Sequence, residues 1–131
     1  APGAGIYTRA FNAQTYARLL EYSRAVLLGG ENTIVDAAFL RASERTGFGA
    51  LAKELDARFV ILHCVAATAT LQERIRARAQ AANDASEATI EVLAKQAEYW
   101  EPFKDEETAH VVAIETATIA LPALIETLAR R

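Results

Sequence analysis

The chain has 131 residues, of which 52% are hydrophobic, and this length predicts one globular domain over residues 1–131. Its 17 acidic and 14 basic residues give a net charge of −3, which argues against a surface that attracts nucleic acid or an anionic membrane. No apolar run approaches the roughly 20 residues that span a bilayer, and a lone cysteine, Cys64, cannot form an internal disulfide. These features favour a cytoplasmic protein without membrane partners.

The first half of the chain predicts two helices around a strand. Phe11 and Asn12 have the pattern of a hydrophobic staple and a helix N-cap, and the helix that follows ends naturally at Gly29–Gly30. Residues 33–36 form a continuous, β-branched run, which is typical of a strand buried on both faces. A second helix is expected from Ser43 onwards.

The second half of the chain predicts five further elements. They are a buried strand at 58–65, a helix from Thr70, a helix from Asp84, a strand at 110–114 and a helix at 120–131. Thr70 and Glu73 have the spacing of a capping box, and the proline of the last helix suits its first turn. Strands that alternate with helices pair in parallel, so the chain predicts a three-layer α/β/α fold with a mostly parallel sheet.

Asp36 is the first candidate for chemistry, because it stands at the predicted carboxyl end of a strand. Ligands of parallel sheets bind beyond these ends. A carboxylate there can hold a water on Mg²⁺ or accept a proton from a hydroxyl group. The alternative interpretation is that Asp36 caps the following turn through backbone amides.

Arg41 and Arg45 follow Asp36 and are four residues apart, so they share a face if the turn between them is helical. Guanidinium groups in that position suit a phosphate, through bidentate contacts. The alternative is a surface ion pair between Glu44 and one of these arginines.

Arg74 and Arg78 are also four residues apart, one turn above each other on a predicted helix. Two stacked cations repel unless an anion lies between them, and the phosphates of a nucleotide would serve. The alternative is a solvated helix on which Glu73 and Asp84 pair with the arginines. Cys64 is interpreted as a core residue of its strand.

Three stretches together resemble the downstream part of a P-loop kinase domain, of the AAA-type or zeta-toxin-like kind found fused to aminoglycoside-phosphotransferase-like domains. They are "YARLLEYSRAVLLGGENTIVDAAFL", "RFVILHC" followed by "LQERIRARAQ", and "DASEATIEVLAKQAEYWEP". The resemblance implies transfer of phosphate from ATP, with Mg²⁺, to a small hydroxyl compound.

The same resemblance suggests residue roles. It implies that Asp36 is a catalytic base or a ligand of metal-bound water, that Arg41 and Arg45 lie on the substrate side, and that Arg74 and Arg78 belong to a lid over ATP. Ala38 departs from the hydroxyl residue that such relatives often carry two positions after the acid.

A larger departure is that no G-x-x-x-x-G-K-[ST] motif occurs in the sequence. In the family, the P-loop strand lies between the strands corresponding to 33–37 and 59–64. We therefore expect a piece of a longer kinase domain, or a degenerate gene product, that is inactive by itself and self-associates through open strand edges. The rival prediction is a non-catalytic interaction or scaffold domain that binds phosphate or nucleotide weakly. A weaker third prediction, phosphorylation of nucleic-acid ends, is disfavoured by the acidic balance.

Overall fold

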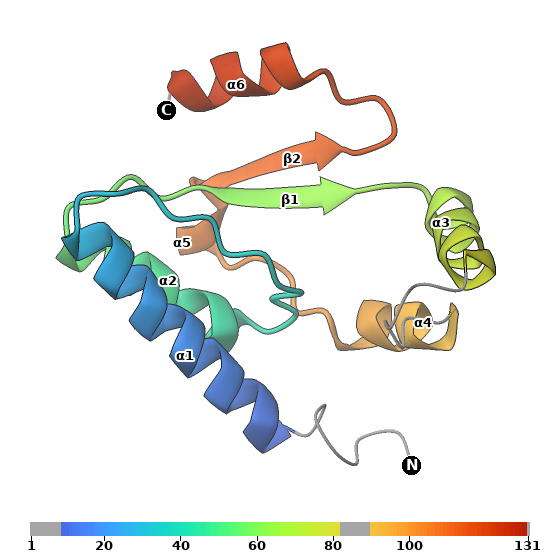
Figure 1. Ribbon diagram of the computed structural model, residues 1–131, viewed down its shortest axis with the longest axis horizontal. Coiled ribbons are helices and arrows are strands. Elements are labelled where there is room, and N and C mark those ends of the chain that lie inside the picture. Colours follow the sequence, from blue (N-terminus) through green and yellow to red (C-terminus); the bar gives the residue numbers. More distant parts are fainter. Residues whose placement is uncertain (1–8, 82–89, 131) are drawn as a thin grey trace. The chain divides into compact units, whose positions relative to one another are not determined.

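The computed structural model describes residues 9–81 and 90–130, in which six helices and two strands are found (Figure 1). They are α1 (Arg9–Leu28), α2 (Ala42–Glu54), β1 (Ile61–Val65), α3 (Thr68–Gln80), α4 (Ile90–Tyr99), α5 (Asp105–Thr108), β2 (Val111–Glu115) and α6 (Leu121–Ala129). The chain divides into two compact units. We call residues 1–59 with 99–104 the helical unit, and residues 60–98 with 105–131 the sheet unit.

The helical unit is built on the contact between α1 and α2. Leu51 and Ala52 of α2 are buried, and Ser23 of α1 is buried with its hydroxyl donating to the carbonyl of Leu19 at 2.8 Å. Gly47 of α2 lies at this contact, where a Cβ atom would lie 3.4 Å from a methyl group of Leu20. The helix predicted from Ser43 onwards is thus confirmed as α2.

The sequence predicted the end of α1 correctly but not its beginning. The helix begins at Arg9, three residues before Asn12, so the predicted N-cap at Asn12 is wrong and this residue lies inside the helix. The end at Gly29–Gly30 is confirmed, because α1 stops at Leu28 and Gly30 has a φ of 84°. Glycine adopts this left-handed conformation without the steric penalty of a Cβ atom.

Residues 33–36 do not form the predicted strand. Ile34 is 91% exposed and Asp36 is exposed. A strand is held by hydrogen bonds to a neighbouring strand, and no strand in the described part of the chain pairs with this segment. The β-branched residues of this segment favour a strand, but the segment does not form one.

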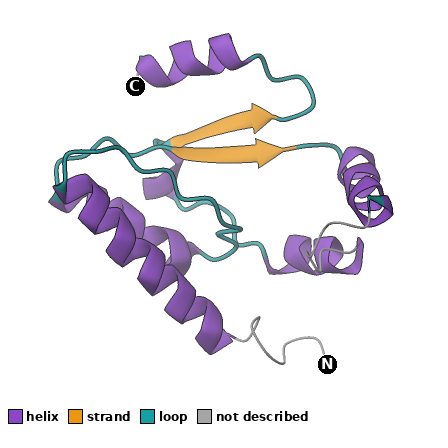
Figure 2. Cartoon of the chain, in the orientation of Figure 1, coloured by secondary structure: helices purple, strands orange, loops and turns teal. Residues whose placement is uncertain are grey.

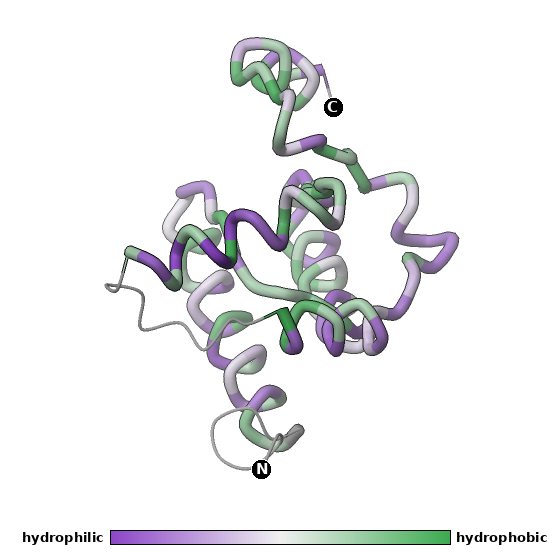
Figure 3. The backbone as a smooth tube through the Cα atoms, turned by 90° about the vertical axis from the view of Figure 1, so that its right-hand side faces the viewer, coloured by the Kyte–Doolittle hydropathy of each residue, from purple (hydrophilic) through white to green (hydrophobic). Residues whose placement is uncertain are grey.

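The sheet unit contains one parallel pair, β1 and β2 (Figure 2). The register places Ile61 opposite Val111 and Val65 opposite Glu115. Val112 and Ile114 of β2 are buried, and β2 and α6 line a common cavity. Figure 3 shows how hydrophobic and hydrophilic residues are distributed along these elements. The α/β class and the parallel pairing are confirmed, whereas a third strand is not found among the described residues.

Three predictions for the sheet unit need correction or comment. The helix α3 begins at Thr68 with Ala67 as its N-cap, so Thr70 lies within the helix and does not cap it. Cys64 is exposed, because it alternates with the less exposed His63 and Val65 along β1, and its assignment to the core is wrong. The start signal at Asp84 lies outside the described residues.

The closing helix agrees with the sequence. Pro122 occupies the first turn of α6, as predicted, where the missing N–H costs no hydrogen bond. No helix in the described ranges is long and apolar enough to cross a membrane.

Candidate functional site

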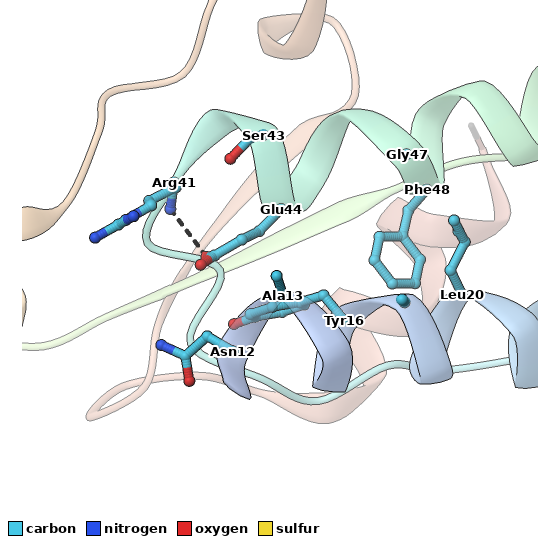
Figure 4. Close-up of a pocket in the computed structure, with 10 residues that line it drawn as sticks. Asn12, Ala13, Tyr16, Leu20, Arg41, Ser43, Glu44, Gly47 and Phe48 are labelled. Atoms are coloured by element: carbon cyan, nitrogen blue, oxygen red, sulfur yellow. Dashed lines mark hydrogen bonds between the residues drawn. The ribbon is translucent and has the colours of Figure 1, made fainter. Parts of the chain in front are cut away.

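A pocket of about 340 Å³ lies between α1 and α2 in the helical unit (Figure 4). We call it the α1–α2 pocket. It is lined by Asn12, Ala13, Tyr16, Ala17, Leu20, Arg41, Ser43, Glu44, Gly47 and Phe48. Its volume is in the range of small-molecule sites, and polar groups are concentrated where α1 faces the first turn of α2.

Two charged residues at the N-terminus of α2 line this pocket, the N-cap Arg41 and Glu44 in the first turn. The backbone N–H of Arg41 donates to Glu44 Oε2 at 3.1 Å, and the N–H of Glu44 donates to the carbonyl of Arg41 at 3.1 Å. A carboxylate at a helix N-terminus is stabilised by the helix dipole. Glu44 therefore binds the backbone of Arg41, and the surface ion pair considered as an alternative for Arg41 is not formed.

The guanidinium group of Arg41 consequently remains available to a ligand. It makes no hydrogen bond or ion pair with residues 9–81 or 90–130, and Figure 4 shows its side chain extending away from the carboxylate of Glu44. A half-buried guanidinium with open N–H donors is suited to a phosphate or carboxylate.

Three aromatic rings pack together in this part of the helical unit, and two of them, Tyr16 and Phe48, line the pocket. The ring centroids of Tyr16 and Phe39 are 5.1 Å apart, and those of Phe39 and Phe48 are 5.3 Å apart in an edge-to-face arrangement. The N–H of Phe39 donates to the hydroxyl oxygen of Tyr16 at 3.0 Å. Burial raises the pKa of the Tyr16 phenol, with a smaller contribution from the nearby carboxylate of Glu44.

Arg45 has a different environment from Arg41. It is only 4% exposed, and its guanidinium donates to the carbonyls of Phe39, Glu101 and Pro102 at 3.0, 3.1 and 3.2 Å. The same group lies 4.9 Å from the centre of the Phe103 ring. Arg45 thus joins the segment before α2 to residues 101–103, and so fixes the backbone beside the pocket.

Asp36 lies in the same unit, five residues before Arg41. It is exposed and makes no hydrogen bond or ion pair within the described ranges. Its carboxylate is therefore open to water, to a metal-bound water or to a hydroxyl group. Among the described residues no group of three histidine, cysteine, aspartate or glutamate side chains could hold a metal ion. One carboxylate is still compatible with Mg²⁺, which commonly binds through one or two protein carboxylates and the phosphates of its nucleotide.

Arg74 and Arg78 lie on α3 in the sheet unit, where both are exposed. Arg74 Nη1 donates to Thr116 Oγ1 at 2.9 Å, and its Nη2 lies 3.5 Å from the Thr116 carbonyl oxygen. Thr116 directly follows β2, so this arginine reaches the carboxyl end of the parallel sheet. The spacing of the two arginines on one helix is confirmed. Their convergence with Asp36 stays a prediction.

Sequence reasoning missed two residues that organise these sites, Tyr16 and Thr116. Their contacts to Phe39 and Arg74 span 23 and 42 residues, and no local pattern reveals such pairs. The position of Glu44 was detectable, because it is the third residue of a helix that begins at Ala42.

A family model described as an AAA domain matches residues 2–103, and the chain belongs to this family. Membership assigns it to P-loop NTPase-like, nucleotide-binding, kinase-like domains, in agreement with the α/β class and the parallel strand pair. Neither the curated proteins nor the solved structures contained a match to this chain.

Proposed function

We propose that the protein to which this chain belongs transfers a phosphoryl group from ATP to a small hydroxyl compound. The observation that carries the proposal is the AAA-domain match over residues 2–103. The sequence contains no G-x-x-x-x-G-K-[ST] motif, so the proposal assigns the phosphate cradle to a segment of the intact protein outside these 131 residues. The chain by itself is proposed to be inactive.

In this proposal the acceptor binds in the α1–α2 pocket. Arg41 supports this placement, since its guanidinium has open donors at the pocket rim. Asp36 accepts the proton of the acceptor hydroxyl or holds a water on Mg²⁺, a role that its exposed carboxylate allows. Arg45 acts on the substrate through the backbone that it fixes, because its own donors are engaged by carbonyl groups.

On the nucleotide side, Arg74 and Arg78 stabilise the phosphates of ATP during transfer. Positive groups that meet the developing charge are the main contribution a protein makes to phosphoryl transfer. Mg²⁺ would neutralise the phosphate oxygens when the nucleotide is bound.

The test uses the full-length natural protein that contains this chain. A thermal-shift screen against ATP, GTP and a panel of sugars and nucleosides identifies the ligands. ATP turnover is then measured for the wild type and for Asp36→Asn, Arg41→Ala and Arg74→Ala. Arg18→Ala is the matched control, because Arg18 is an exposed arginine of α1 that forms an ion pair with the exposed Glu21. Turnover that survives all three site variants at the wild-type rate would remove these residues from the proposal.

A non-catalytic interaction domain is the second candidate function. Exposed apolar side chains favour it, since Ile34 is 91% exposed and Leu121 and Ile125 of α6 are largely exposed. β1 is also bonded on one edge only within the described sheet, and a free edge can pair with another chain. Sedimentation of the protein with and without ATP separates the candidates: concentration-dependent association together with absent ATP turnover supports the interaction domain.

A further inference from the structure

The hydroxyl of Thr116 connects three elements of the sheet unit. Its Oγ1 donates to the carbonyl of Val65 at 3.2 Å and accepts from Nη1 of Arg74 at 2.9 Å. The backbone N–H of Thr116 donates to the same Val65 carbonyl at 2.9 Å. A hydroxyl group has one donor and two acceptor positions, so it can make both side-chain bonds at once.

These bonds give Thr116 a fixed place at the carboxyl end of the parallel pair. β1 ends at Val65 and β2 ends at Glu115, so Thr116 continues the hydrogen bonding of the pair by one residue. Because α3 follows β1 directly, the bond from Arg74 draws the guanidinium back to the edge where parallel sheets bind ligands. Thr116 is the only partner of Arg74 within residues 9–81 and 90–130.

The contact leaves the arginine able to bind an anion. A guanidinium has five N–H donors, and the contacts to Thr116 engage one on each of two nitrogens. An exposed arginine has many rotamers, and ordering them opposes ligand binding. A hydrogen bond made before the ligand arrives reduces that loss, which is the physical meaning of pre-organisation.

We propose that Thr116 is a positioning residue, which holds the guanidinium of Arg74 at the carboxyl edge of the sheet for a phosphate of the nucleotide. This inference rests on the proposed function, because it takes Arg74 as a nucleotide-binding group. Thr116 acts through Arg74 and does not itself touch the substrate.

The experiment is a double-mutant cycle with MgATP binding to the full-length protein as the readout. Thr116→Val keeps the shape of the side chain and removes the hydroxyl, so the Kd for MgATP is expected to rise about fivefold, the value of one hydrogen bond. Arg74→Ala is expected to raise the Kd at least as much. The combination of the two is expected to equal Arg74→Ala alone, because Thr116 has nothing left to position.

Two controls separate positioning from general stability. Thr116→Ser restores the hydroxyl and is expected to bind within about twofold of the wild type. Thr118→Val removes a hydroxyl from the same turn that has no described side-chain partner, and it is expected to change nothing. A threonine that merely supports the fold would also weaken binding in the Arg74→Ala background.

The outcomes distinguish this inference from the proposed function. If Arg74→Ala weakens MgATP binding while Thr116→Val leaves it unchanged, or if their effects add, the positioning role is overturned and Arg74 keeps its place. If Arg74→Ala leaves MgATP binding unchanged, Arg74 does not bind the nucleotide. The proposed function is then contradicted at this residue, and Thr116 has no positioning role. Should Thr116→Val not fold, failure of Thr116→Ser to restore wild-type binding overturns the role.

Discussion

Arg24 in α1 and Glu54 in α2 face each other in a two-bond ion pair, although they are 30 residues apart in sequence. Arg24 Nη1 lies 2.7 Å from Glu54 Oε1, and Nη2 lies 2.9 Å from Oε2. The parallel arrangement of two N–H···O bonds is the strongest geometry for this pair. The hydrogen bond from Arg24 lowers the pKa of Glu54 and raises that of Arg24.

This pair predicts a dependence of stability on acid. Because the pKa of Glu54 is lower in the folded than in the unfolded state, its contribution is present above the unfolded pKa and is lost as the pH falls through the folded one. Glu54→Gln is therefore expected to lower Tm at neutral pH, and the difference from the wild type is expected to shrink as the pH falls below the ordinary carboxyl pKa of about 4.3 and through the lower pKa of the folded state. Thermal melts of the wild type and the variant across this pH range test the prediction. A substitution in the exposed pair of Arg18 and Glu21 is the control for removal of a surface charge. An equal Tm at neutral pH would contradict the prediction.

Arg45 is expected to be important for stability. Arg45→Met removes donors from three backbone carbonyls and a cation–π contact, which should reduce the free energy of unfolding by about 2–4 kcal/mol. Arg45→Lys should recover only part of this loss, because an ammonium lacks the planar fork. Urea unfolding measures both. Arg18→Met, at an exposed arginine, should stay within about 0.5 kcal/mol of the wild type.

Leu51 defines the apolar core of the helical unit. It is 3% exposed, so Leu51→Ala should cost about 3 kcal/mol through lost burial and the cavity left behind. Leu28→Ala is the matched control, because Leu28 is 67% exposed at the end of α1 and should change the free energy of unfolding by less than about 0.5 kcal/mol. Equal costs for the two substitutions would show that Leu51 is not in the core.

Tyr16 should ionise later than an ordinary tyrosine. Its pKa is raised above the usual 10.0, chiefly by burial, so in an alkaline titration followed by tyrosinate absorbance the ionisation of Tyr16 should be delayed. Tyr16→Phe should remove that step, whereas Tyr22→Phe, at a residue 63% exposed, should not. A raised pKa in the folded state also means that its contribution to stability is complete below about pH 10 and declines as the pH rises further.

Cys64 should react in the native protein. The chain has one cysteine, and its side chain on β1 is exposed, so a thiol reagent is expected to modify one group per chain without denaturant. Cys64→Ser, which has no thiol, is the control and should not react with the reagent. A reaction that requires unfolding would restore the core assignment made from the sequence.

The sequence by itself predicted each described helix except α5, together with the α/β class and the parallel pairing. Periodic apolar residues located α1 and α2, and Gly30 marked the end of the first helix. The β-branched runs that became β1 and β2 were recognisable because they are long enough and bounded by turns. These are local properties, so a short window of residues contains the information.

Only the tertiary structure decided which residues meet. Residues 33–36 have the composition of a strand, but a strand also needs a partner, and pairing is a property of two segments. Arg41 and Arg45 looked equivalent in sequence, yet one faces the pocket and the other is buried on the carbonyls of residues 39, 101 and 102. The link between Arg74 and Thr116 likewise joins residues 42 apart. Contacts of this range depend on how helices and strands pack, and this packing follows no fixed spacing along the chain.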